Sequence, residues 1–133
     1  MSVYGKTAVK AVELFANTHD IQKAWTEAVQ IFTNSHSARM KGCPKNAFFG
    51  LCRAGLIKGI SVQSLQKEES KNAEYAIIAV NLLKEDASWA NKKTACWEKI
   101  QEIIGEVKKH NSQLDVVISL WNKGLIQERF CNY

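Results

Sequence analysis

Residues 33–48, TNSHSARMKGCPKNAF, concentrate side chains that could bind an anion or react. The stretch holds serine, arginine, lysine and cysteine but no carboxylate, and we expect a loop that feeds a helix beginning at Pro44. The first N–H groups of a helix lack intrahelical partners and carry partial positive charge, so phosphate, sulfate or carboxylate binds there readily. We therefore predict an anion-binding site at this helix start. Its residues are Ser37, Arg39, Lys41, Cys43 and Lys45.

Cys43 is also a weak candidate for a catalytic nucleophile, because a thiol at or next to a helix N-cap lies in a field that activates it. The only evident base nearby is His36, seven residues away, and the sequence does not orient its ring. Beside Pro44, the cysteine could instead fill an apolar gap. The chain carries no P-loop, GxGxxG, HExxH or GxSxG motif, so these common enzyme classes are not indicated.

We expect no metal site and no cofactor. The three histidines are scattered and the four cysteines include no CxxC pair, so zinc or redox chemistry is not indicated. Glu98, Glu102 and Glu106 recur every four residues, but without a histidine at matching spacing they indicate a solvated helix face. His19 and His110 fall in expected helix ends or loops, where a histidine often meets the C-terminal helix dipole.

The charge is distributed unevenly along a chain whose formal net charge is +5. No carboxylate occurs between Glu27 and Glu68, whereas basic residues are frequent there. This asymmetry indicates an anionic partner for the first half of the chain. The alternative is a solvated basic surface that only keeps the protein soluble.

The elements that must position these residues are helices. The single proline is Pro44, and apolar residues recur at three- and four-residue spacing almost everywhere. We predict helices over residues 8–15 and over residues 20–32, the second with Asp20 as its N-cap. A third helix should run from Pro44 to just before Gly55, and residues 61–70 should connect it to the rest.

The second half of the chain repeats the first. AIIAVNLL at 76–83 matches AVKAVELF at 8–15 with an offset of 68, and LWNKGLI at 120–126 matches LCRAGLI at 51–57 with an offset of 69. We predict one all-α domain, residues 1–133, of about six helices in two similar three-helix units, 1–60 and 70–126. Either unit alone would have a marginal core, so the units should pack together. The alternative is chance reuse of Ala, Leu and Val.

The two Gly-Leu-Ile segments have the spacing of helix ends. With Gly55 or Gly124 just past a helix, the leucines on either side of the glycine are placed for the apolar contact of a Schellman cap. We therefore predict left-handed backbone at both glycines. Ser112 and Asp115 have the spacing of a capping box at the start of the last helix.

SARMKGCPKNAFFGLCRAGLIKGI at 37–60 and NSQLDVVISLWNKGLI at 111–126 resemble a family of small uncharacterised bacterial proteins. The pattern they share with it is KGCPxxAFxGLCxxGLxKGI. The resemblance implies a bacterial cytosolic protein, and it brings no activity, cofactor or catalytic residue.

The sequence favours a non-enzymatic binding or interaction protein. Its partner would be an anionic ligand, a nucleic acid or an acidic protein, met by the basic patch at the start of the third helix. The alternatives are a nucleic-acid-associated regulator and an enzyme that uses Cys43 as its nucleophile. No apolar run is long enough to span a bilayer and no signal peptide is evident, so we expect no membrane partner and a cytoplasmic location. The oligomeric state is not predicted.

Overall fold

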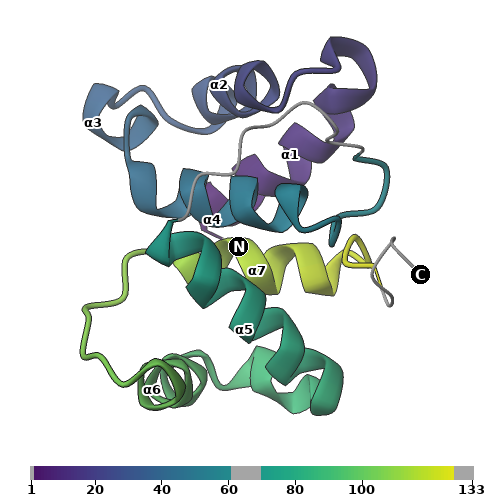
Figure 1. Cartoon of the computed structure of the whole chain (residues 1–133). Helices are drawn as coiled ribbons and strands as arrows, with labels where there is room; N and C mark the ends of the chain where they lie inside the picture. The colour runs from purple at the N-terminus through teal and green to yellow at the C-terminus, as the bar shows by residue number, and fades with distance from the viewer. Residues whose placement is uncertain (1, 61–69, 128–133) are drawn as a thin grey trace.

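The computed structural model describes residues 2–60 and 70–127, and within these ranges every long element is an α-helix (Figure 1). The helices are α1 (Val3–Thr18), α2 (Ile21–Phe32), α3 (His36–Arg39), α4 (Gly42–Arg53), α5 (Lys71–Glu85), α6 (Lys93–Ile104) and α7 (Gln113–Asn122), with a 3₁₀ turn, η1 (Ala87–Asn91), between α5 and α6. The predicted all-α class is confirmed; α3 and η1 were not predicted. None of the described helices is long and apolar enough to cross a membrane.

Most helices begin where a side chain accepts a hydrogen bond from the first turn; α4 and α6 are exceptions, because their N-cap residues make no such bond. Asp20 caps α2 as predicted, its carboxylate accepting from the N–H of Lys23 at 3.2 Å. The loop expected before Pro44 is wrong in part, because residues 36–39 form α3. Helix α4 begins at Gly42, two residues before the predicted start, and Pro44 is its third residue. A proline is tolerated there because the N–H groups of a first turn have no intrahelical partner.

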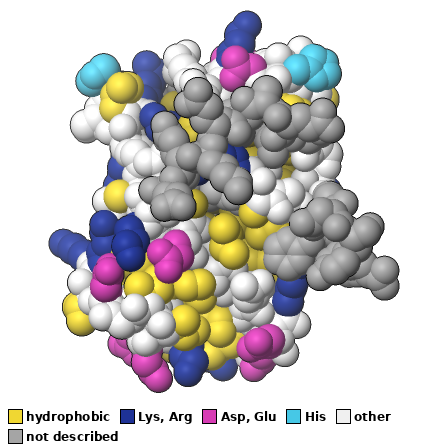
Figure 2. Space-filling view, viewed as in Figure 1, with side chains coloured by type: hydrophobic (Ala, Val, Ile, Leu, Met, Phe, Trp, Pro, Cys, Tyr) yellow, Lys and Arg dark blue, Asp and Glu magenta, His cyan; other side chains and the backbone are white. Residues whose placement is uncertain are grey.

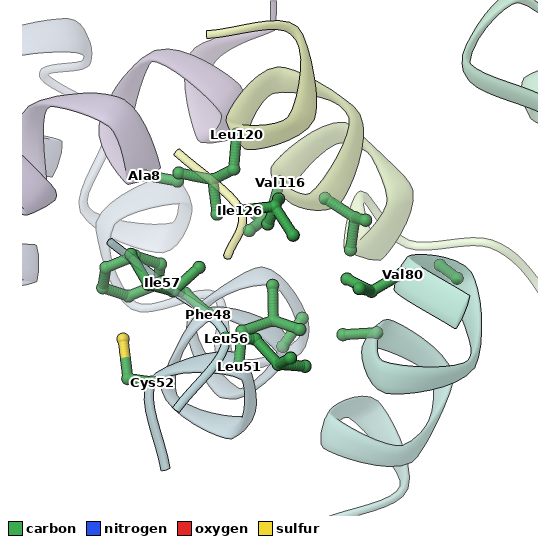
Figure 3. Packing of buried hydrophobic residues seen from close by; sticks show 14 of the residues in the cluster. Ala8, Phe48, Leu51, Cys52, Leu56, Ile57, Val80, Val116, Leu120 and Ile126 are labelled. Carbon is green, nitrogen blue, oxygen red and sulfur yellow. The ribbon is translucent and has the colours of Figure 1, made fainter. Parts of the chain in front are cut away.

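The predicted apolar stripes face a common core. Ala8, Ala11 and Phe15 of α1 are buried, as are Trp25 of α2 and Trp97 of α6. Figure 3 shows the centre of this core, where side chains from α1, α4, α5 and α7 point toward one another. Their packing joins the two halves of the chain in one core.

Helices α4 and α7 run side by side in the same direction through the middle of the molecule (Figure 1). Helix α1 packs on α7, and α5 packs on α4. A Cβ added to Gly5 of α1 would lie 2.9 Å from the Cβ of Ser119 and closer still to its hydroxyl. A Cβ added to Gly50 of α4 would lie 2.6 Å from the Cα of Ala73 and closer still to its Cβ. Both pairs of helices therefore depend on a glycine at the point of closest approach.

Both Gly-Leu-Ile segments end their helices as predicted. Gly55 and Gly124 have left-handed backbone, with φ of 74° and 71°. In each copy the N–H of the leucine after the glycine donates to the carbonyl of the leucine five residues earlier, at 3.0 Å. The predicted Schellman caps are confirmed.

The two segments also pair with each other, which the sequence did not predict. The N–H of Lys58 donates to the carbonyl of Leu125 at 2.8 Å, and the N–H of Gln127 donates to the carbonyl of Leu56 at 2.8 Å. These bonds form an isolated antiparallel bridge. Figure 3 shows the side chains of the bridge residues, Ile57 and Ile126, inside the core. The bridge therefore holds the segments that follow α4 and α7 against each other.

Replacing Gly124 with alanine should lower the free energy of unfolding by about 1 kcal/mol or more, because a Cβ is strained in left-handed backbone. No atom lies within 4 Å of the added Cβ, so the cost is conformational and not steric. Gly124→Asn should cost less, since asparagine tolerates this conformation better. Thermal or urea denaturation of the two variants checks the order, and equal stability of Gly124→Ala and the wild type would contradict the capping role.

Candidate anion-binding site

The N-termini of α4 and α7 meet at one end of the molecule, at the left edge of Figure 1. Asn111, just before α7, donates from Nδ2 to Sγ of Cys43 in the first turn of α4, at 3.3 Å. Lys41, the N-cap residue of α4, is close enough to His110 to disfavour a positive charge on its ring. Because the two helices are parallel, the partial positive charges of both N-termini fall in the same place. We call this end of the molecule the joined helix start.

Three of the predicted site residues, Lys41, Cys43 and Lys45, lie in or next to the first turn of α4. Lys41 places its Nζ over the ring of Tyr4, 5.2 Å from the ring centroid. The hydroxyl of Tyr4 donates to the carbonyl of Ala38 at 3.1 Å, and burial raises the pKa of this phenol, which keeps it a neutral donor. Tyr4 therefore fixes the backbone at Ala38, shortly before α4 begins.

Ser37 and Arg39 lie on α3 and make their bonds within the segment that precedes α4. The hydroxyl of Ser37 is 3.1 Å from the hydroxyl of Ser35, and Nε of Arg39 donates to the carbonyl of Thr33 at 2.9 Å. These contacts give both side chains a structural role in shaping α3. No contact of the described residues joins Ser37 or Arg39 to Cys43.

The partial positive charge at the start of α4 is not offset by a capping side chain or an acidic residue. No side chain accepts a hydrogen bond from its first turn, and that turn has no acidic residue. Helix α7 does carry an acid, Asp115, whose carboxylate is paired with Lys93 at 2.8 Å. The ion pairs of the described residues include neither Lys41 nor Lys45. The unneutralised positive charge is therefore at α4.

Residues 105–112, which join α6 to α7, run along the same edge. The indole N–H of Trp97 donates to the carbonyl of Lys108 at 2.8 Å, and the N–H of Lys108 donates to Oε1 of Gln101 at 2.7 Å. These bonds fix the backbone and leave the side chains of Lys108 and Lys109 exposed. Figure 2 shows cationic side chains, with carboxylates beside them, where this segment passes the start of α5.

Gln113 ties the segment to the interior. Its side chain is fully buried, with Oε1 accepting from the N–H of Asn111 at 2.7 Å and Nε2 donating to Oδ1 of Asn72 at 2.9 Å. Through Asn111, this chain of bonds reaches Cys43. The joined helix start is thus connected to α5 by part-buried hydrogen bonds.

The predicted capping box at Ser112 and Asp115 is wrong. Ser112 has a φ of 71°, its side chain caps nothing, and Asp115 turns to Lys93. Nε2 of His110 instead accepts from the N–H of Leu114 at 3.2 Å. His110 lies in a loop, as predicted, but it acts as a neutral acceptor at a helix N-terminus instead of meeting a C-terminal dipole.

The ring of His110 packs edge-to-face on Trp97, with 5.0 Å between centroids. Burial lowers the pKa of His110 below its usual 6.5, the carboxylate of Asp115 opposes that effect, and Lys93 and Lys41 reinforce it. His19, by contrast, ends α1 in left-handed backbone and is exposed, as its predicted place at a helix end requires.

The described cysteines divide by burial. Cys52 and Cys96 are buried, and burial raises the pKa of each thiol above its usual range, so both pack as small apolar groups. Cys43 is half-buried and bonded to Asn111, while His36 is exposed on α3. Cys131 lies outside the described residues.

The predicted row of glutamates is interrupted. Helix α6 ends at Ile104, and Gly105 turns the chain with a φ of 81°, so Glu106 does not continue the face of Glu98 and Glu102. Glu106 pairs with Lys71 at 3.1 Å. No cluster of metal-ligating side chains occurs among residues 2–60 and 70–127.

Sequence reasoning missed the contribution of the second half of the chain to this site. His110 and Asn111 lie at the joined helix start, and Lys108 and Lys109 directly precede them in the chain. When the second half of the sequence is aligned on the first with the offset of 69, His110 corresponds to Lys41 and Ser112 corresponds to Cys43. Had the two units been expected to pack with their third helices parallel, that offset would have indicated these residues.

Comparison with known proteins places the chain without assigning an activity. No curated protein and no solved structure matches it. One family model matches residues 1–127, nearly the whole chain, and its description is a family of unknown function. The predicted resemblance to an uncharacterised family is confirmed at this level: the chain belongs to the family of unknown function DUF6979.

Proposed function

We propose that this protein is a non-enzymatic binding module that takes an anionic group at the joined helix start. The observation that carries the proposal is the meeting of two parallel helix N-termini at Cys43 and Asn111, one of them uncapped and without an acidic residue. A bacterial origin and a cytoplasmic location belong to the same proposal, since residues 37–60 and 111–126 resemble bacterial proteins.

Cations from both halves of the chain support binding of an anion. Lys41 and Lys45 come from the start of α4, and Lys108 and Lys109 come from the segment before α7. Binding is favoured over catalysis because the hydrogen-bonding neighbour of Cys43 is an amide and not a base. The weak candidate nucleophile thus lacks a described group to take its proton.

Lys41→Glu should weaken binding of inorganic pyrophosphate by about tenfold at neutral pH, because it places a carboxylate where the first turn of α4 is open. Lys123→Glu makes the same change of charge at the opposite end of α7, where the lysine is exposed, and should change the affinity less than about twofold. Isothermal titration calorimetry measures both. Equal losses in the two variants would show a general effect of net charge and reject a site at α4.

A nucleic acid is the second candidate partner, because the basic residues between Glu27 and Glu68 extend beyond the joined helix start. Binding to single-stranded RNA or DNA would then weaken steeply as salt rises. A mobility-shift assay at low salt tests this candidate, and no retention of either nucleic acid would eliminate it.

We also infer that the two halves arose by duplication of a three-helix unit. Ala73 stands 68 residues after Gly5, and Ser119 stands 69 residues after Gly50, so the two close helix contacts involve matching positions. The paired helix stops support the same inference. In a crystal structure, residues 3–58 should superpose on residues 71–127 with α1, α2 and α4 on α5, α6 and α7; failure of that order of superposition would reject it.

A further inference from the structure

We propose that protonation of His110 opens the segment between α6 and α7 and thereby strengthens anion binding at the joined helix start. This inference rests on the proposed function, because it concerns how the same site is regulated. Its basis is the contact between Nε2 of His110 and the N–H of Leu114 at 3.2 Å. Only a neutral imidazole has a lone pair to accept that bond.

The contact cannot survive protonation unchanged. An imidazolium carries a hydrogen on each nitrogen, so Nε2–H would face the Leu114 N–H and two donors would repel. The ring is also packed against Trp97, in a place where a charge is poorly solvated. The protonated ring must therefore turn or leave, and the neighbouring backbone of residues 109–111 moves with it.

The charged groups around the ring come from three elements. Asp115 of α7 favours the imidazolium, whereas Lys93 of α6 and Lys41 at the start of α4 disfavour it. Burial is the largest influence, and the net effect lowers the pKa of His110 below 6.5. The closed arrangement therefore predominates above about pH 6.5 and is lost as the pH falls through that lowered pKa.

Opening changes the site in two ways that both favour an anion. The N–H of Leu114, in the first turn of α7, loses its internal acceptor and becomes free to bind a ligand. The ring itself gains a positive charge close to Lys41 and to the start of α4. By linkage, an anion bound at the joined helix start must in turn raise the pKa of His110.

The neighbouring bonds show why the movement reaches α4. Asn111 follows His110 directly and donates to Cys43. The bond from the Asn111 N–H to the buried Gln113 limits how far the segment can travel. Lys108, held by Trp97 and Gln101, limits it on the other side. The moving part is thus a short stretch of backbone at the site, with the six long helices left in place.

His110→Gln provides the decisive comparison, because a glutamine amide oxygen can accept from the Leu114 N–H at every pH and does not titrate. Sulfate is the probe, since its charge stays constant between about pH 7.5 and pH 5. We expect the affinity of the wild-type protein for sulfate, measured by NMR titration, to rise at least about fivefold over this range. In His110→Gln it should change less than about twofold, and His36→Gln, on exposed α3, should behave as the wild type.

Hydrogen exchange separates this proposal from the proposed function. The protection factor of the Leu114 amide should fall about fivefold or more between pH 7.5 and pH 5 in the wild type without sulfate, and stay constant in His110→Gln. The same pH dependence of sulfate binding in both proteins would overturn the regulation and leave the site intact. If sulfate binds at no pH, the anion site and the predicted gain in affinity are both rejected. Hydrogen exchange of the Leu114 amide then still tests whether protonation of His110 opens the segment.

Discussion

Gly50→Ala should lower the free energy of unfolding by about 3 kcal/mol, and the melting temperature by roughly 10 °C. The added Cβ would lie 2.6 Å from the Cα of Ala73, so α4 and α5 must separate. Alanine is otherwise the better helix former by about 1 kcal/mol, and the clash has to exceed that gain. Gly42→Ala, in the same helix with its nearest neighbour 3.6 Å away, is the matched control and should leave stability unchanged or raise it by up to about 1 kcal/mol.

The equivalent contact of α1 with α7 gives a sharper test of the same idea. Gly5→Ala should cost about 2 kcal/mol, because its Cβ meets the side chain of Ser119. Ser119→Gly removes that side chain and should restore much of the loss in the double variant. Ala73→Gly cannot do the same for Gly50→Ala, since the obstructing Cα is backbone. Equal rescue at both contacts, measured by urea denaturation, would contradict the geometry.

Gln113→Ala should lower the free energy of unfolding by about 3 kcal/mol. The substitution leaves the N–H of Asn111 and the amide oxygen of Asn72 without their partner, and it opens a cavity where the side chain is fully buried. Gln30→Ala deletes the same side-chain atoms at an exposed position of α2, where they contact water, and should cost almost nothing. Thermal melts of the pair measure the difference.

Gln113→Glu tests the same network through pH. An ionised carboxylate cannot donate to Asn72 and is costly to bury, so the pKa of the new acid should rise above its usual range. A protonated carboxyl can donate, and the stability of this variant should therefore be lowest near neutral pH and recover as the pH falls. Stability independent of pH would show that the new carboxyl is neither buried nor a donor to Asn72.

Helix positions and helix ends were predictable because they depend on local chemistry. The spacing of apolar residues identified the buried faces, as at Ala8, Ala11 and Phe15. The count from Gly55 back to Leu51 and on to Leu56 identified a cap that needs only six consecutive residues. The start of α4 was misplaced by two residues because Lys41 caps it with no side-chain bond, so no residue type marks the boundary.

The candidate site was predicted only in part because half of its residues are not local in sequence. The basic residues before α4 are visible in the sequence, but their neighbour Asn111 is 68 residues from Cys43. The role of His110 depends on a turn at Ser112 with a φ of 71°, an uncommon conformation for serine that its sequence did not indicate. A capping box was the better local prediction there, and tertiary packing overrode it.

The bridge between residues 57 and 126 has a consequence for the order in which the chain can fold. Its two hydrogen bonds join segments 69 residues apart, and the contacts of α1 with α7 and of α4 with α5 also connect the halves. Contacts so distant in sequence are slow to form, since a long loop must close before they stabilise anything. On the ribosome, the first half of the chain, α1 to α4, would wait with its apolar face uncovered until α7 has emerged. A chaperone that shields apolar surface during synthesis should therefore raise the yield of this protein more than its small size alone would suggest.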